Sequence, residues 1–103
     1  MQRSYLKADV RFYRPEKGGR AFVPVSDGYA PYLRAATLST DLPARLNGIP
    51  SNGKYDTSYE VEIELSYHPK LDYSSLTEGS KVELVEGPKV VGEGIVTSKI
   101  YTK

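Results

Sequence analysis

A strict alternation of acidic and aliphatic residues at positions 60–65 is the feature that most constrains the fold of this chain. Three glutamates alternate there with the aliphatic residues Val61, Ile63 and Leu65. Because successive side chains of a β-strand point to opposite faces, this spacing predicts a strand with an aliphatic inner face and a charged outer face. The glutamates lie on one face of one strand, so we interpret them as a solvent-facing row, not as paired catalytic carboxylates.

Other segments extend this β-pattern along the chain, and helical periodicity is nearly absent. Residues 8–13 and 81–85 alternate in the same way, and residues 89–101 predict a longer last strand with Gly92 and Gly94 inside it. Interior glycines of this kind indicate a bulge or a sharp barrel corner. The sequence predicts six or so strands, and the fold class that follows is all-β, a small closed antiparallel six-stranded Greek-key barrel.

Turn chemistry separates the predicted strands. The segment 15–19, Pro-Glu-Lys-Gly-Gly, is expected to close a hairpin, because its glycines can adopt positive φ. A second tight turn is predicted at residues 86–88. Residues 46–57 are rich in Asn, Gly, Ser and Pro, so we expect a long, exposed loop there.

Length and composition favour one globular domain spanning residues 1–103. No apolar run approaches the ~20 residues of a membrane span, and the first residues lack the apolar region of a secretory signal. We therefore expect a cytoplasmic protein without membrane contact. The absence of cysteine excludes disulfides, thiolate metal sites and cysteine nucleophiles.

The residues that carry out catalysis in common enzyme classes are missing. No phosphate-binding loop of the G-x-x-x-x-G-K-[ST] type is present, and His68 is the only histidine. One histidine cannot build a multi-histidine metal site, and we expect His68 to be structural or simply exposed. The sequence predicts no catalytic residues, no metal and no cofactor, and hence a protein that is not an enzyme.

The net charge of +1 hides an uneven distribution. Residues 1–34 carry seven basic and three acidic groups, which gives +4, whereas residues 35–103 carry seven basic and ten acidic groups, which gives −3. Such a bipolar surface can steer a charged partner. Around the two predicted turns, the partner-binding candidates form a basic rim of Arg14, Lys17, Arg20 and Lys89.

Nine tyrosines provide broad contact area with a polar tip. Several must pack inside so small a barrel. Tyr55 and Tyr73 fall in predicted loops, so we consider them possible recognition residues.

Motifs at both ends of the chain resemble the C-terminal (third) β-barrel domain of elongation factor Tu. Residues 8–12 and 16–20 are similar to its opening strand and EGGR turn, and residues 24–31 to its P…GYRP stretch. His68-Pro69 and residues 86–96 are similar to its His-Pro and its EGG-VGxGVV signature. In that family the domain holds aminoacyl-tRNA and packs on a GTPase domain. Ala30 and Val85 stand where the family carries arginine, so neither contact carries over position by position.

The resemblance implies a stand-alone single-domain relative of this barrel. Taken with the missing catalytic groups, it predicts a non-enzymatic binding module, with a protein as the expected partner. A weak RNA-binding module of the tRNA-like kind is the alternative. The sequence names neither the partner nor the oligomeric state.

Overall fold

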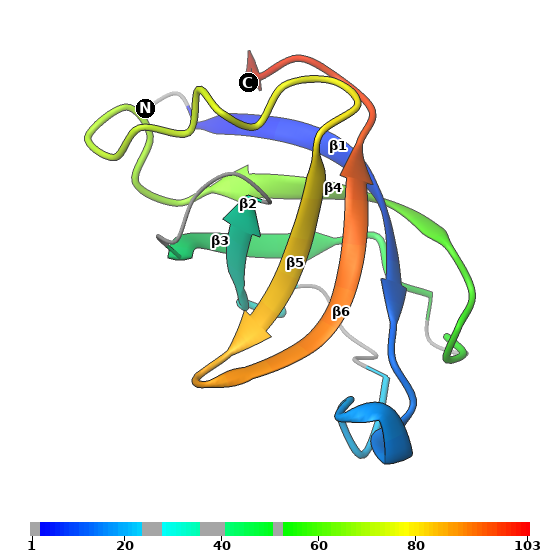
Figure 1. Ribbon diagram of the computed structural model, residues 1–103. Coiled ribbons are helices and arrows are strands. Elements are labelled where there is room, and N and C mark those ends of the chain that lie inside the picture. Colours follow the sequence, from blue (N-terminus) through cyan, green and yellow to red (C-terminus); the bar gives the residue numbers. More distant parts are fainter. Residues whose placement is uncertain (1–2, 24–27, 36–40, 51–52) are drawn as a thin grey trace.

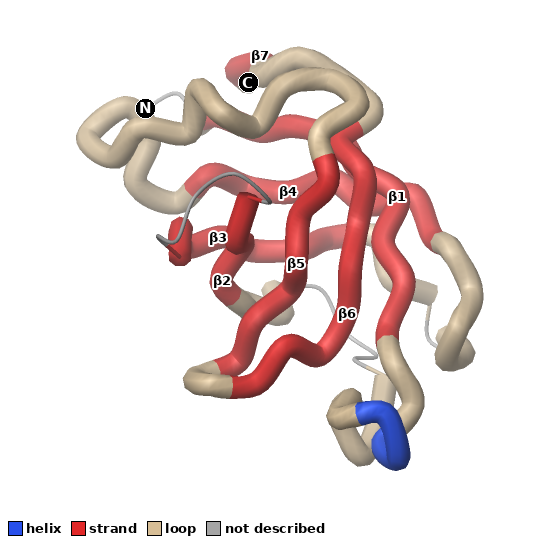
Figure 2. The backbone as a smooth tube through the Cα atoms, in the orientation of Figure 1, coloured by secondary structure: helices blue, strands red, loops and turns tan. Residues whose placement is uncertain are grey.

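The computed structural model describes residues 3–23, 28–35, 41–50 and 53–103, and its regular structure is almost all β-strand (Figures 1 and 2). Pro24, which belongs to the resemblance, lies outside these residues. The elements in chain order are β1 (Ser4–Phe12), the 3-10 helix η1 (Pro15–Lys17), β2 (Tyr32–Ala35), β3 (Asp41–Asn47), β4 (Tyr59–Leu65), β5 (Lys81–Glu86), β6 (Lys89–Val96) and β7 (Tyr101–Thr102).

Six strands close into an antiparallel barrel in the order β1-β4-β3-β2-β5-β6, and β6 pairs back onto β1. Strands β2, β3 and β4 are consecutive neighbours, whereas β5 returns to lie beside β2, which is a Greek-key connection. The predicted closed six-stranded Greek-key barrel is confirmed. The seventh strand, β7, is an addition that pairs only with the first two residues of β1.

The alternating sequence pattern places the aliphatic side chains inside the barrel. Val61, Ile63 and Leu65 of β4 are each at most 2% exposed, and the inward side chains of β1 are equally buried. Two residues of the long β4–β5 connection, Tyr73 and Leu76, also belong to this core. Because each of the six barrel strands contributes one face to a common interior, the barrel has a single hydrophobic core.

The predicted irregularity of the last long strand is confirmed in β6. Leu84 pairs with Gly92 and Val85 with Val90, so Val91 is an extra residue on β6, as in a β-bulge. A Cβ atom on Gly92 would lie 2.5 Å from the carbonyl oxygen of Arg11 in the neighbouring β1. Glycine therefore allows β6 to approach β1 closely enough to close the barrel.

Two boundaries predicted from the sequence are wrong. The last strand does not continue from 89 to 101, because β6 ends at Val96 and β7 begins at Tyr101. The segment 46–57 is not an exposed loop throughout, since Leu46 is fully buried in β3 and Ile49 is also buried. The polar composition of this segment concealed two inward-pointing side chains.

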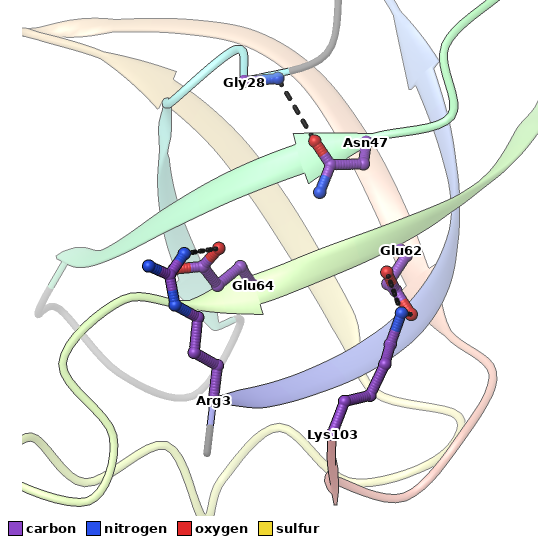
Figure 3. Close-up of polar contacts among 6 residues, drawn as sticks. All are labelled: Arg3, Gly28, Asn47, Glu62, Glu64 and Lys103. Carbon is purple, nitrogen blue, oxygen red and sulfur yellow. Dashed lines mark hydrogen bonds and ion pairs between the residues drawn. The ribbon is translucent and has the colours of Figure 1, made fainter. Parts of the chain in front are cut away.

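The two ends of the described chain lie side by side at one end of the barrel. The backbone N–H of Arg3 donates to the carbonyl of Lys103 (3.2 Å), and the N–H of Lys103 donates to the carbonyl of Arg3 (3.1 Å). Their side chains reach the outer face of β4, where Arg3 pairs with Glu64 (3.3 Å) and Lys103 with Glu62 (2.9 Å; Figure 3). The glutamate row faces outward as predicted, but these two carboxylates are paired and partly covered.

Candidate binding groove

The groove begins with the loop that follows β1. Pro15 occupies the first turn of η1, and Gly18 ends it with a φ of 90°. Gly19 has no room for a side chain, because a Cβ atom there would lie 1.8 Å from the carbonyl oxygen of Tyr13. The predicted turn is present, but the predicted hairpin is not. Among the described residues, the segment after Gly19 does not return as a strand beside β1, whose partners are β4, β6 and β7.

A second loop, residues 53–57, packs against this η1 loop. The N–H of Asp56 donates to the carbonyl of Phe12 (3.0 Å), and the carboxylate of Asp56 pairs with Arg14 (2.7 Å). The hydroxyl of Tyr55 donates to the carbonyl of Arg20 (2.6 Å). These three contacts fix the two loops to each other at the end of β1.

A groove of about 670 Å³ lies between the two loops. Its most exposed apolar member is Phe22, whose relative exposure is 78%, whereas Val23 beside it belongs to the core. The groove is lined by Arg14, Ala21, Phe22, Val23, Gly53, Lys54, Tyr55 and Thr57. A large aromatic side chain left in water at the edge of a groove marks a contact surface, because its burial by a partner is favourable.

Arg20 anchors the η1 loop to the β5–β6 turn. Its Nε lies 2.9 Å from the carboxylate of Glu86, and its guanidinium carbon lies 4.9 Å from the centre of the Tyr29 ring. The hydroxyl of Tyr29 donates to the same carboxylate. Burial of Tyr29, followed by the hydrogen bond to Glu86, raises the pKa of its hydroxyl, so the tyrosine stays protonated and remains a donor. The Arg20 side chain is thus occupied by contacts within the barrel.

The predicted basic rim is only partly assembled at this groove. Arg14 lines it but is paired with Asp56, which raises the pKa of the guanidinium. Lys17 is exposed in η1 and, within the described ranges, forms no ion pair. Lys89 does not line the groove. It begins β6 and pairs with Glu86 across the β5–β6 turn. The η1 loop therefore carries three of the four residues, and Arg20 alone bridges to the second turn.

The two candidate tyrosines have different environments. Tyr55 is half-buried and lines the groove, so it remains a candidate contact residue. Tyr73 lies in the connection between β4 and β5, outside the strands as predicted, but its exposure is 0%, so it does not suit a recognition role. Its hydroxyl donates to the carbonyl of Pro43 (2.7 Å) and accepts from the N–H of Tyr67 (3.3 Å). A side chain with these contacts stabilises the core and is not available to a partner.

Sequence reasoning did not single out Phe22 or Lys54, and both belong to the groove. The run Ala21-Phe22-Val23 between a glycine pair and a proline resembles a short buried strand. Only Val23 is buried there, since the chain bends at Ala21 and Phe22 and turns the aromatic ring outward. The sequence feature that could have indicated an exposed Phe22 is its position three residues after the turn at Gly18 and Gly19.

Comparison with known families does not identify the groove, because no protein-family model matches the sequence. No group of three or more His, Cys, Asp or Glu residues within 3–23, 28–35, 41–50 and 53–103 is arranged to hold a metal ion. The same ranges contain no helix of the length and apolar character needed to cross a membrane.

Proposed function

We propose that this protein is a non-enzymatic binding module that engages a protein partner through the groove beside Phe22. The observation that carries the proposal is the 78% exposure of Phe22 next to the groove wall formed by Tyr55. Aromatic side chains that become buried on association contribute much of the binding energy of protein interfaces. The groove provides both a wall for a partner's apolar side chain and a ring that the partner can cover.

Charge near the groove favours a partner segment that carries acidic residues. Lys54 lines the groove and Lys17 lies in the adjoining loop, and neither forms an ion pair with another residue in the described part of the chain. Arg14 is already neutralised by Asp56. Lys54 in the lining and Lys17 in the adjoining loop complement a partner segment with an apolar anchor and carboxylates next to it.

RNA is the second candidate, because an exposed aromatic ring near cations is also how proteins stack single-stranded bases. The sequence pI of about 7.9 favours the protein partner, since nucleic-acid-binding domains are usually more basic, with pI above about 9. The family relationship of the chain is also a proposal. We infer a relative of the elongation factor Tu C-terminal barrel from the ordered motifs of the sequence.

The experiment is affinity capture from native extract with the parent and two groove variants, Phe22→Ser and the double variant Lys17→Glu/Lys54→Glu. We expect both variants to lose a protein that the parent captures. Ile95→Ser is the matched control, because Ile95 is also an exposed apolar residue (46%) but lies on β6, away from the groove. Capture by all three variants alike would contradict the groove as the binding site.

Nuclease treatment and salt distinguish the two partner classes. Capture that survives ribonuclease supports a protein partner. Capture that ribonuclease abolishes, with log affinity falling linearly against log salt by about 0.7 per single-strand phosphate contacted, supports RNA instead.

A further inference from the structure

A second concave site lies at the opposite end of β1 from the groove. It is a polar pocket of about 370 Å³ where β1 begins and β4 ends. Its lining residues are Arg3, Ser4, Arg45, Glu64, Leu65, Ser66, Tyr67 and His68. The nine residues of β1 separate the pocket from the η1 loop by roughly 27–30 Å of strand, so the two sites are independent surfaces.

The pocket holds more positive than negative charge. Arg3 pairs with Glu64 (3.3 Å) yet keeps 59% of its side chain exposed (Figure 3). Arg45 lies opposite Glu64 in the register of β3 and β4 and is exposed. It forms no ion pair with any residue in the described part of the chain. Two guanidinium groups beside one carboxylate leave a net charge of +1 in the lining, with donors to spare, because each guanidinium has five N–H groups.

A fixed histidine forms one wall of this pocket. Ser4 is a polar residue, yet it is buried, with 7% exposure. Its Oγ lies 2.7 Å from Nδ1 of His68. When Ser4 donates in this bond, the neutral imidazole carries its proton on Nε2, which is then a donor as well. Ser66 and Tyr67 also line the pocket, and each side chain carries a hydroxyl group that can donate a hydrogen bond.

We propose that this pocket binds a phosphoryl group. Two arginines, a histidine and two hydroxyls supply donors of the charge and number that an anionic group with three or four oxygens can accept. Guanidinium groups match phosphate geometry with paired N–H donors. Arg3 and Glu64 both line the pocket and are joined by a hydrogen bond, so one of the two arginines already has a partner that orients it before the anion arrives.

The test uses His68 as its own reporter, because it is the only histidine and gives a unique imidazole signal in proton NMR. Inorganic phosphate is titrated at constant pH and ionic strength, with chloride as the control anion. We expect a saturable shift of the His68 signal, with a dissociation constant of about 1 mM, and no such shift with chloride. A shift that stays linear, or that chloride reproduces, would overturn the proposal.

Variants link the signal to the pocket. Arg45→Gln should weaken phosphate binding about tenfold, because it removes a charge-assisted donor from an exposed position that the fold does not need. Lys89→Gln is the matched control and should bind as the parent does, since Lys89 lies at the β5–β6 turn. Equal affinity of the Arg45 variant and the parent would refute the site.

A parallel titration with a phosphoserine peptide and its unphosphorylated form identifies the source of the phosphoryl group. Tighter binding of the phosphopeptide than of inorganic phosphate assigns the pocket to a phosphorylated protein segment. Equal affinity assigns it to the free anion. Failure of both the phosphopeptide and inorganic phosphate to bind would contradict the proposal, and neither result depends on the groove at Phe22.

Discussion

The two ends of β1 have chemically different surroundings. At Ser4 polar pairs join distant segments, Ser4 with His68 and, on the outer face of β4, Arg3 with Glu64. At Phe12 two loops are joined through Tyr55 and Asp56, and the aromatic ring of Phe22 remains in water. One end thus offers hydrogen-bond donors and the other offers apolar surface. A single barrel wall can carry two chemically distinct sites without enlarging its core.

The largest expected effect comes from disturbing the packing of β6 against β1, the strand that connects the two sites. Gly92→Val should destabilise the protein by about 3 kcal/mol, because the new Cβ atom would lie 2.5 Å from the carbonyl of Arg11 and 3.1 Å from Leu84. Chemical unfolding measures the loss, and both binding sites should be lost together at temperatures where the variant unfolds. Ile95→Val, at an exposed position of the same strand, should change stability by less than about 0.5 kcal/mol. Parental stability of Gly92→Val would contradict the close approach of β6 to β1.

A smaller effect should separate the core contribution of Tyr73 from any role in contact. Tyr73→Phe keeps the buried ring but removes the hydroxyl that bonds to the Pro43 carbonyl and the Tyr67 N–H. We expect a loss of about 1–2 kcal/mol in unfolding free energy, since a buried carbonyl loses its partner. Capture through the groove should be unchanged. Lost capture with parental stability would restore Tyr73 as a contact residue.

Tyr73 also shows what the sequence could and could not predict. Local alternation was sufficient to identify β1, β4 and β5, because each buries one face against a shared core. Strand β3 escaped detection because Pro43 interrupts it, and proline usually argues against an inner strand. In the structure Pro43 is tolerated within β3, and its carbonyl accepts a bond from Tyr73, thirty residues away. No local pattern contains that contact.

In the candidate sites too, groupings of residues that are neighbours in the chain were predictable, whereas contacts between distant residues were not. The sequence correctly grouped Arg14, Lys17 and Arg20 around one turn, because they are neighbours in the chain. It could not foresee that Arg20 pairs with Glu86 or that Ser4 meets His68. These contacts join positions that are 66 and 64 residues apart, and they depend on the register of the closed barrel. Which charges remain free for a partner is therefore a property of the fold.

A third prediction concerns the Phe12 end of β1, where the two loops meet. Arg20→Ala should cost about 1 kcal/mol, because it removes a part-buried ion pair with Glu86 and the stacking on the Tyr29 ring. The hydrogen bond from Tyr29 to Glu86 should remain. Thermal unfolding measures the loss, and the phosphate affinity of the pocket at the other end should not change. A weakened phosphate affinity would show that the two ends are coupled.

The smallest effect is expected at the chain ends and depends on pH. Hydrogen bonds from Tyr101 and then Lys103 lower the pKa of Glu62 in the folded protein. A lowered carboxyl pKa adds stability that is complete above the unfolded value near 4.5 and is lost as pH falls through the folded value. We expect Glu62→Gln to cost about 0.5 kcal/mol at pH 7, with the difference from the parent shrinking below pH 4.5. A constant difference from pH 7 to pH 3 would argue against this ion pair.

The same contact acts with the opposite sign in alkali. Burial, and then the bond to Glu62, raises the pKa of Tyr101 to about 12. Its contribution is therefore complete below pH 10 and is lost as pH rises toward 12. All nine tyrosines contribute to the ultraviolet phenolate band, so the difference in absorbance between the parent and a Tyr101→Phe variant follows this ionisation. Glu62→Gln should shift the ionisation of Tyr101 to lower pH.

The pairing of β1 determines when this barrel can form during synthesis. β1 is the first of these seven strands to leave the ribosome, yet its partners are β4, β6 and β7, and β6 ends only at Val96. Until those residues emerge, β1 can pair only with β4. Closure of the barrel requires pairing between β1 and β6, two strands that are far apart in the sequence. Such long-range topology folds slowly. We therefore expect nascent chains that stop before β6 to remain unfolded and susceptible to proteases, and the barrel to close only after Val96 has emerged.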